Sequence, residues 1–256
     1  MIFFCFSANV LAYELKLLPG RSAPKPSAVL NVVFCPLNYQ RQDDFLKDAA
    51  MMMRRLSETK PFEEFAQAIG AYTVTLSAKE VAAIFKRVQD FPPLKVRQDF
   101  LDSISSRLGS DYKLVIVDAL SSSFCAELSS IDKMSLIVLG KARYKGTNSF
   151  AKGFLHELGH SLGLRDESSG AEAKHSPVGY PNCARNREEA QEWWGDLTGK
   201  AAYVDYINGC CGNADYFRPT IASLMNDTEK AEDFGPVNQR YLKKTLSAQE
   251  GRPSSR

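Results

Sequence analysis

The segment that most constrains this chain runs from residue 154 to residue 166 and reads FLHELGHSLGLRD. Four residues turn an α-helix through about 400°, so His156 and His160 would lie on one helix face, one turn apart. Apolar residues flank both histidines, which predicts that this helix is buried and that each imidazole needs a polar partner. Because only three histidines occur in 256 residues, this pairing points to a specific site rather than to a solvated helix face.

The donor atoms in this segment predict a metal site. Two imidazoles one turn apart can converge on one cation at about 2.0–2.1 Å, the distance that zinc prefers. Glu157 is rotated roughly 100° from His156, which keeps its carboxylate off the ion but beside a water bound there. Gly163 would end the helix with a positive φ, and Asp166 would then supply a third ligand. We therefore predict one catalytic Zn²⁺ held by His156, His160 and Asp166, with Glu157 as general base.

The hydrophobic pattern predicts an α+β fold with helices packed on a mixed, twisted sheet. Residues 28–166 would form an N-terminal sheet subdomain that carries the zinc-binding helix. Residues 167–246 would form a smaller subdomain rich in loops and helices, and residues 247–256 a frayed tail. The expected strands cover 28–35, 71–76, 113–118 and 134–139. The expected helices cover 45–56, 80–88, 96–108, 150–162, 186–197 and 236–246.

Residues 1–27 are predicted to be a signal segment followed by a linker at 19–27. Met1–Ala12 is apolar and ends in small residues, as a secretory signal cleaved after Ala12 would, but it lacks a basic start. A buried first strand is the alternative interpretation, and the sequence leaves both open.

Six cysteines are present, and their surroundings differ. Cys183 and either Cys210 or Cys211 lie in a region rich in Gly and Asn, where a disulfide is expected if the protein is exported. Cys35 and Cys125 adjoin apolar sequence and fit buried free thiols better. The localisation expected from the signal-like segment Met1–Ala12 is secreted or extracytoplasmic.

The charge balance excludes some partners. Lys and Arg outnumber Asp and Glu by 32 to 30, a net charge of +2. The chain therefore lacks the excess of basic residues that binding to nucleic acid requires. No segment reaches the roughly 20 consecutive apolar residues that a membrane span needs. We expect a monomer whose partner is a protein or peptide substrate.

The motif HExxHxxGxx followed by a third ligand resembles the signature of the metzincin metallopeptidases. Aspartate at the third place is similar to the snapalysins, and HELGHSLGLRDE resembles the IgA-peptidase-like metallopeptidases over about residues 28–245. The resemblance implies a zincin fold, a methionine turn at Ser223–Asn226 with Met225 beneath the imidazoles, and substrate addition to a sheet edge at Leu136–Leu139. Several relatives have a longer spacing before the Asp-Glu pair, so Asp166 and Glu167 both remain candidates for the third ligand, and spacing favours Asp166.

The function expected from these features is zinc-dependent hydrolysis of peptide bonds. One alternative is a zinc hydrolase of another amide, in peptidoglycan or a glycan, and another is a non-catalytic binding module stabilised by zinc. A structural zinc site has no use for the carboxylate of Glu157, which argues against the last. Four further residues carry weaker signals and are expected to be solvated or structural, namely His175, Trp193, Trp194 and Arg218.

Overall fold

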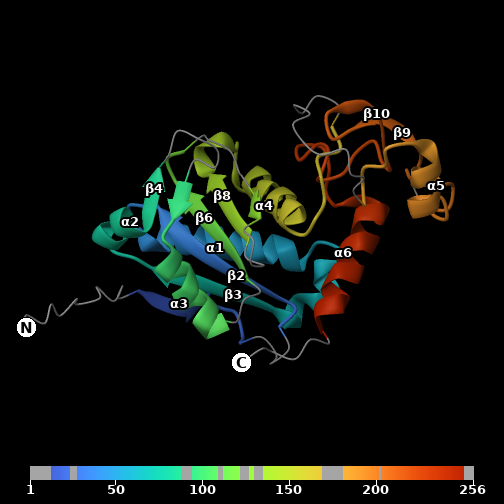
Figure 1. Ribbon diagram of the computed structural model, residues 1–256. Helices are drawn as coiled ribbons and strands as arrows, with labels where there is room; N and C mark the ends of the chain where they lie inside the picture. Colours follow the sequence, from blue (N-terminus) through green and yellow to red (C-terminus); the bar gives the residue numbers. More distant parts are fainter. Residues whose placement is uncertain are drawn as a thin grey trace, which may run out of the picture.

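The computed structural model describes residues 13–23, 28–87, 94–108, 112–121, 127–129, 135–168, 181–201 and 203–250 (Figure 1). Three sequence predictions lie outside these residues, namely the signal segment Met1–Ala12, the thiol of Cys125 and the loop residue His175. Within the described ranges, no helix combines the length and the apolar character that crossing a bilayer demands.

A six-stranded sheet forms the centre of the fold, in the order β1-β3-β2-β6-β8-β7. The strands are β1 (Glu14–Leu17), β2 (Leu30–Leu37), β3 (Ile69–Thr75), β6 (Tyr112–Asp118), β7 (Glu127–Ser129) and β8 (Ser135–Gly140). The four inner strands are parallel, and the two outer strands β1 and β7 are antiparallel to their neighbours. The mixed sheet and its helices agree with the predicted α+β class. The four expected strands are confirmed within a few residues, and β1 falls inside the segment expected to be signal and linker.

The prediction that Leu136–Leu139 forms a sheet edge is wrong. Strand β8 pairs with β6 on one side, and β7 pairs with Ser135–Ile137 on the other. The edge position is therefore taken by β7, a three-residue strand that is too short to show a periodic pattern in the sequence.

Alternating side chains divide the sheet into two packed faces. One face packs on α1 (Gln42–Ser57), the 3₁₀ helix η1 (Phe62–Ala68), α4 (Thr147–Ser161) and α6 (Gly235–Glu250). The other packs on α2 (Ala78–Ile84), α3 (Gln98–Leu108) and a small hairpin of β4 (Phe85–Arg87) and β5 (Leu94–Val96). Ser77 and Glu80 form a capping box at the start of α2. Val96, expected in a helix, instead lies in β5.

A smaller C-terminal region lies to one side of the sheet, at the upper right of Figure 1. It contains α5 (Arg187–Trp194) and a hairpin of β9 (Ile207–Cys210) and β10 (Asn213–Arg218), which the sequence did not predict. Helix α6 contributes Val237 to the core of this region and Leu242 and Leu246 to the main core. The prediction of a tail from residue 247 is wrong for residues 247–250, which continue α6 beyond the buried Leu246.

Helix α4 is fixed to its neighbours by charged groups as well as by packing. The Lys152 side chain is only 4% exposed, and its Nζ lies 2.5 Å from Glu232 Oε1. The second carboxylate oxygen of Glu232 lies 2.6 Å from Arg55 Nη2 on α1. At the end of α4, Lys113 Nζ on β6 donates to the carbonyl oxygen of Ser161 at 2.8 Å. The first two contacts connect α4 to α1 through Glu232, and the third connects the C-terminal end of α4 to the sheet.

Glu232→Gln should lower the free energy of unfolding by roughly 1–3 kcal/mol, because a buried ammonium group loses its ionised partner. Glu229→Gln is the matched control, since it makes the same change of charge on an exposed side chain. Urea denaturation of both variants measures the difference. Equal stability of the two would show that Lys152 does not depend on this ion pair.

Candidate functional site

Helix α4 carries His156, Glu157 and His160 and ends where the sequence predicts. Gly163 adopts φ of +104°, a conformation that favours glycine because it has no Cβ. The backbone N–H of Gly163 donates to His160 O and that of Leu164 to Gly159 O. The chain therefore reverses immediately after the helix and brings Asp166 back toward the histidines.

Three donor atoms converge on one point. The Nε2 atoms of His156 and His160 lie 3.1 Å apart. Asp166 Oδ1 lies 3.2 Å from the first of these nitrogens and 3.4 Å from the second. Two ligands held at 2.0–2.1 Å by a tetrahedral ion are themselves roughly 3.3 Å apart. The triangle of donor atoms therefore has the dimensions of one face of a zinc coordination tetrahedron.

Glu157 lies beside this triangle rather than in it. Its Oε1 is 3.8 Å from His156 Nε2, farther than Asp166, and its side chain is 10% exposed. A Glu157 oxygen lies within 4.8 Å of both imidazole nitrogens, a position expected for a base that acts on a bound water.

Both imidazoles are oriented by backbone carbonyls. His156 Nδ1 contacts Leu224 O at 2.6 Å, and His160 Nδ1 contacts Leu164 O at 3.0 Å. A carbonyl oxygen can only accept a hydrogen bond, so each Nδ1 carries a proton and donates. In the neutral rings the lone pairs then reside on the two Nε2 atoms, which face each other. Such an arrangement needs a positive charge between the nitrogens.

The electrostatics of the metal-free site point to the same need for a cation. Burial lowers the pKa of His156, but the hydrogen bond to Asp166 and the charge of Glu157 outweigh burial and bring its pKa to about 9. Burial raises the pKa of Asp166, but the two histidines reverse this and hold its pKa well below the usual range. Both pKa shifts have the direction expected of a site that favours a positive charge at this point.

The predicted methionine turn packs against the helix. Met225 is fully buried, and a Cβ added at Gly159 would lie 2.6 Å from Met225 Sδ and 2.9 Å from the Phe234 ring. Only glycine at position 159 allows this approach. The turn also supplies the carbonyl of Leu224 that orients His156, so it supports the site both by packing and by hydrogen bonding.

Glu167 points away from the convergence point into the protein interior. It is fully buried, and its Oε2 accepts from Ser223 Oγ at 2.6 Å. Its Oε1 accepts from Asn238 Nδ2 at 2.7 Å and from Asn182 Nδ2 at 3.2 Å. Between the two candidates for third ligand, Asp166 is therefore the one that faces the histidines. Glu167 instead joins the methionine turn, α6 and the loop before α5.

The sequence did not predict the hydrogen bonds of Glu167 to Asn182, Ser223 and Asn238. Asn182, Ser223 and Asn238 come from three distant segments, and no local pattern connects them. One signal was present: Asn238 occupies the same helical face as Leu242 and Leu246, at spacings of four and eight residues. A polar residue at a buried helical position needs a polar partner.

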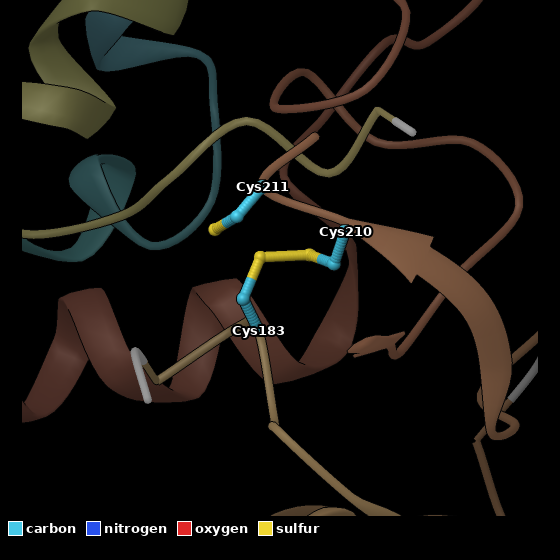
Figure 2. Close-up of side chains that lie close together, drawn as sticks. All are labelled: Cys183, Cys210 and Cys211. Atoms are coloured by element: carbon cyan, nitrogen blue, oxygen red, sulfur yellow. A yellow bond between two sulfur atoms is a disulfide. The ribbon is translucent and has the colours of Figure 1, made fainter. Parts of the chain in front are cut away.

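A disulfide lies directly behind Asp166. The structure pairs Cys183 with Cys210, while Cys211 remains a free thiol (Figure 2). The two bridged sulfurs lie 3.6 and 3.7 Å from the Asp166 carbonyl oxygen, which also accepts from the Cys211 N–H at 2.9 Å. The open choice between Cys210 and Cys211 is thus resolved in favour of Cys210. Cys35 is a buried free thiol, as expected.

The remaining candidate residues have structural roles. Arg218 Nη1 donates to the carbonyls of Glu167, Asn208 and Gly209. Trp194 is fully buried and donates through Nε1 to Asp205 O. Trp193 lines a pocket of about 580 Å³ between α5 and α6, apart from the histidines.

Glu167→Gln should lower the free energy of unfolding by about 1–3 kcal/mol, because an amide cannot accept all three hydrogen bonds and leaves a buried donor unpaired. Glu192→Gln, on an exposed face of α5, should change it by less than about 0.5 kcal/mol. Chemical denaturation of the two variants provides the comparison. A fully stable Glu167→Gln protein would contradict the role assigned to this network.

Comparison with known proteins does not identify a family. No protein-family model matches the chain, and no curated protein matches it. The resemblance to the IgA-peptidase-like metallopeptidases therefore stays a prediction, and the functional argument depends on the geometry of His156, His160 and Asp166.

Proposed function

We propose that this protein is a zinc-dependent endopeptidase whose active site is built from His156, Glu157, His160 and Asp166. The observation that carries the proposal is the triangle of two imidazole nitrogens and one carboxylate oxygen, with sides of 3.1, 3.2 and 3.4 Å. A free carboxylate stands beside it, as a hydrolytic mechanism requires.

The donor set fits zinc in three respects. Imidazole nitrogen and carboxylate oxygen are both ordinary zinc ligands. The other nitrogen of each ring already donates to a backbone carbonyl, which fixes the tautomer that presents a lone pair to the ion. Three protein ligands are also the number found in catalytic sites, which leave one position for water or substrate.

In this proposal zinc, when bound, would polarise the substrate carbonyl and lower the pKa of a water from 15.7 toward about 7. Glu157 accepts the proton of the attacking water on its carboxylate and passes it to the leaving amine. His156 and His160 stay neutral ligands, because their Nδ1 protons are held by Leu224 and Leu164. Asp166 adds a negative charge, which strengthens the hold on the cation.

The zincin architecture is part of the same proposal. It is supported by the position of Met225 under Gly159 and by the mixed sheet, in which four parallel strands are flanked by an antiparallel strand at each edge. A protein or peptide substrate is the expected partner of a monomer. A secreted or extracytoplasmic location is supported by the Cys183–Cys210 disulfide, since such bonds persist in oxidising compartments.

Glu157→Gln should reduce kcat by roughly 10²–10⁴-fold, the usual contribution of a general base, while zinc still binds. Cleavage of a denatured protein substrate and the zinc content of the purified variant are both measured. Glu188→Gln, on the exposed face of α5, serves as control and should cleave at the wild-type rate. A zinc-loaded Glu157→Gln protein with wild-type turnover would overturn the mechanism.

Removal of zinc with a chelator should abolish cleavage and leave the circular dichroism spectrum largely unchanged, because the hydrophobic core of this fold does not depend on the ion. The alternative, a binding module stabilised by zinc, requires loss of the folded signal on chelation.

A digest of a peptide library, compared with digests of peptidoglycan and of glycan-linked amides, separates peptide hydrolysis from hydrolysis of another amide.

A further inference from the structure

Three cysteine sulfurs form a second cluster on the far side of the Asp166 backbone. The Sγ atoms of Cys183, Cys210 and Cys211 all lie within 4.8 Å of one another. Figure 2 shows the free Cys211 side chain directed toward the disulfide between the other two. Nothing in the proposed hydrolysis uses the thiol of Cys211, so its place in this cluster needs another explanation.

The turn between β9 and β10 brings these sulfurs together by an unusual backbone. Neighbouring residues of an extended strand point to opposite sides, so adjacent cysteines would normally face apart. Cys211 instead adopts φ of +52°, between Gly209 at +91° and Gly212 at +69°. A left-handed conformation costs a non-glycine residue about 1–2 kcal/mol. This turn thereby keeps the Cys210 and Cys211 sulfurs within 4.8 Å of each other.

Hydrogen bonds hold the turn in this conformation. The N–H of Cys211 donates to Asp166 O at 2.9 Å, and that of Gly212 donates to Ser168 O at 3.0 Å. Cys183 reaches the cluster from the loop before α5, where Ala184 pairs with Phe217 of β10. Because these anchors are backbone contacts, the three cysteine positions do not depend on the disulfide alone for their proximity.

Three convergent sulfurs are a donor set for soft metal ions, which prefer thiolate ligands. Sulfur ligands at about 2.3 Å from a tetrahedral ion are roughly 3.8 Å apart, a spacing compatible with the 4.8 Å limit on this cluster. In the oxidised protein, the disulfide occupies two of the three donors. The cluster can therefore bind such an ion only after that bond is broken.

We propose that reduction converts the Cys183, Cys210 and Cys211 cluster into a binding site for one soft metal ion, separate from the imidazole site. A dithiol reductant supplies two electrons and two protons, the bond between Cys183 and Cys210 breaks into two thiols, and the reductant becomes a cyclic disulfide. Metal binding then forms bonds to three sulfurs and releases their protons to the solvent.

Cadmium is the probe, because its bonds to sulfur give an ultraviolet charge-transfer absorption that nitrogen and oxygen ligands do not. The full-length protein is reduced, freed of reductant without oxygen and titrated with Cd²⁺. Wild type should show this absorption with a one-to-one end point, and the oxidised protein should show much less. Cys211→Ser should weaken the binding at least tenfold, since even changes outside the ligand set cost about 10–100-fold.

Cys35→Ala is the matched control, because it removes a thiol buried in the sheet, outside the cluster, and should leave cadmium binding unchanged. Circular dichroism is recorded in parallel. If reduction unfolds the protein, Cd²⁺ should restore the native spectrum of wild type but not of Cys211→Ser. Equal absorption from Cys211→Ser and wild type, or the absence of both absorption and refolding, would overturn the proposal.

Discussion

The site depends on two hydrogen bonds from imidazole N–H groups to backbone carbonyls. Leu224 and Leu164 accept from the Nδ1 atoms of His156 and His160, so in the neutral rings the lone pairs lie on the Nε2 atoms. Those atoms are 3.1 Å apart. Two lone pairs at this distance repel each other unless a positive charge lies between them, and the nearby carboxylate of Asp166 reinforces that demand. The remainder of the fold keeps these carbonyls in position.

The support for the site comes from segments that are far apart in the chain. Met225 packs directly under Gly159, and Ser223 of the same turn donates to the buried carboxylate of Glu167. Glu167 also accepts from Asn182 and Asn238. Its neighbour Asp166 is therefore positioned by the interior of the protein, although its own side chain is 43% exposed. A buried, hydrogen-bonded Glu167 next to a partly exposed Asp166 suits the proposed metal site, because the first fixes the backbone and the second stays accessible.

Local features of the site could be predicted from the sequence because they depend on helix geometry alone. The spacing of His156 and His160 determines their common face, and Gly163 determines where the helix ends. The strands β2 and β6 were predictable for another local reason, because a short run of apolar residues indicates a buried strand. The position of β7 at the sheet edge, the β9–β10 hairpin and the Glu167 network were not. The strands β7, β9 and β10 are short or polar segments, which carry little periodic signal. The Glu167 network joins segments that are far apart in the chain.

In the proposed site, a zinc ion binds two imidazoles and a carboxylate rather than sulfur. Zinc K-edge X-ray absorption of the oxidised protein loaded with one zinc ion tests this most directly. The account predicts only nitrogen and oxygen neighbours at about 2.0–2.2 Å, together with the outer scattering of two imidazole rings. A sulfur neighbour at about 2.3 Å, or the absence of imidazole scattering, would contradict it.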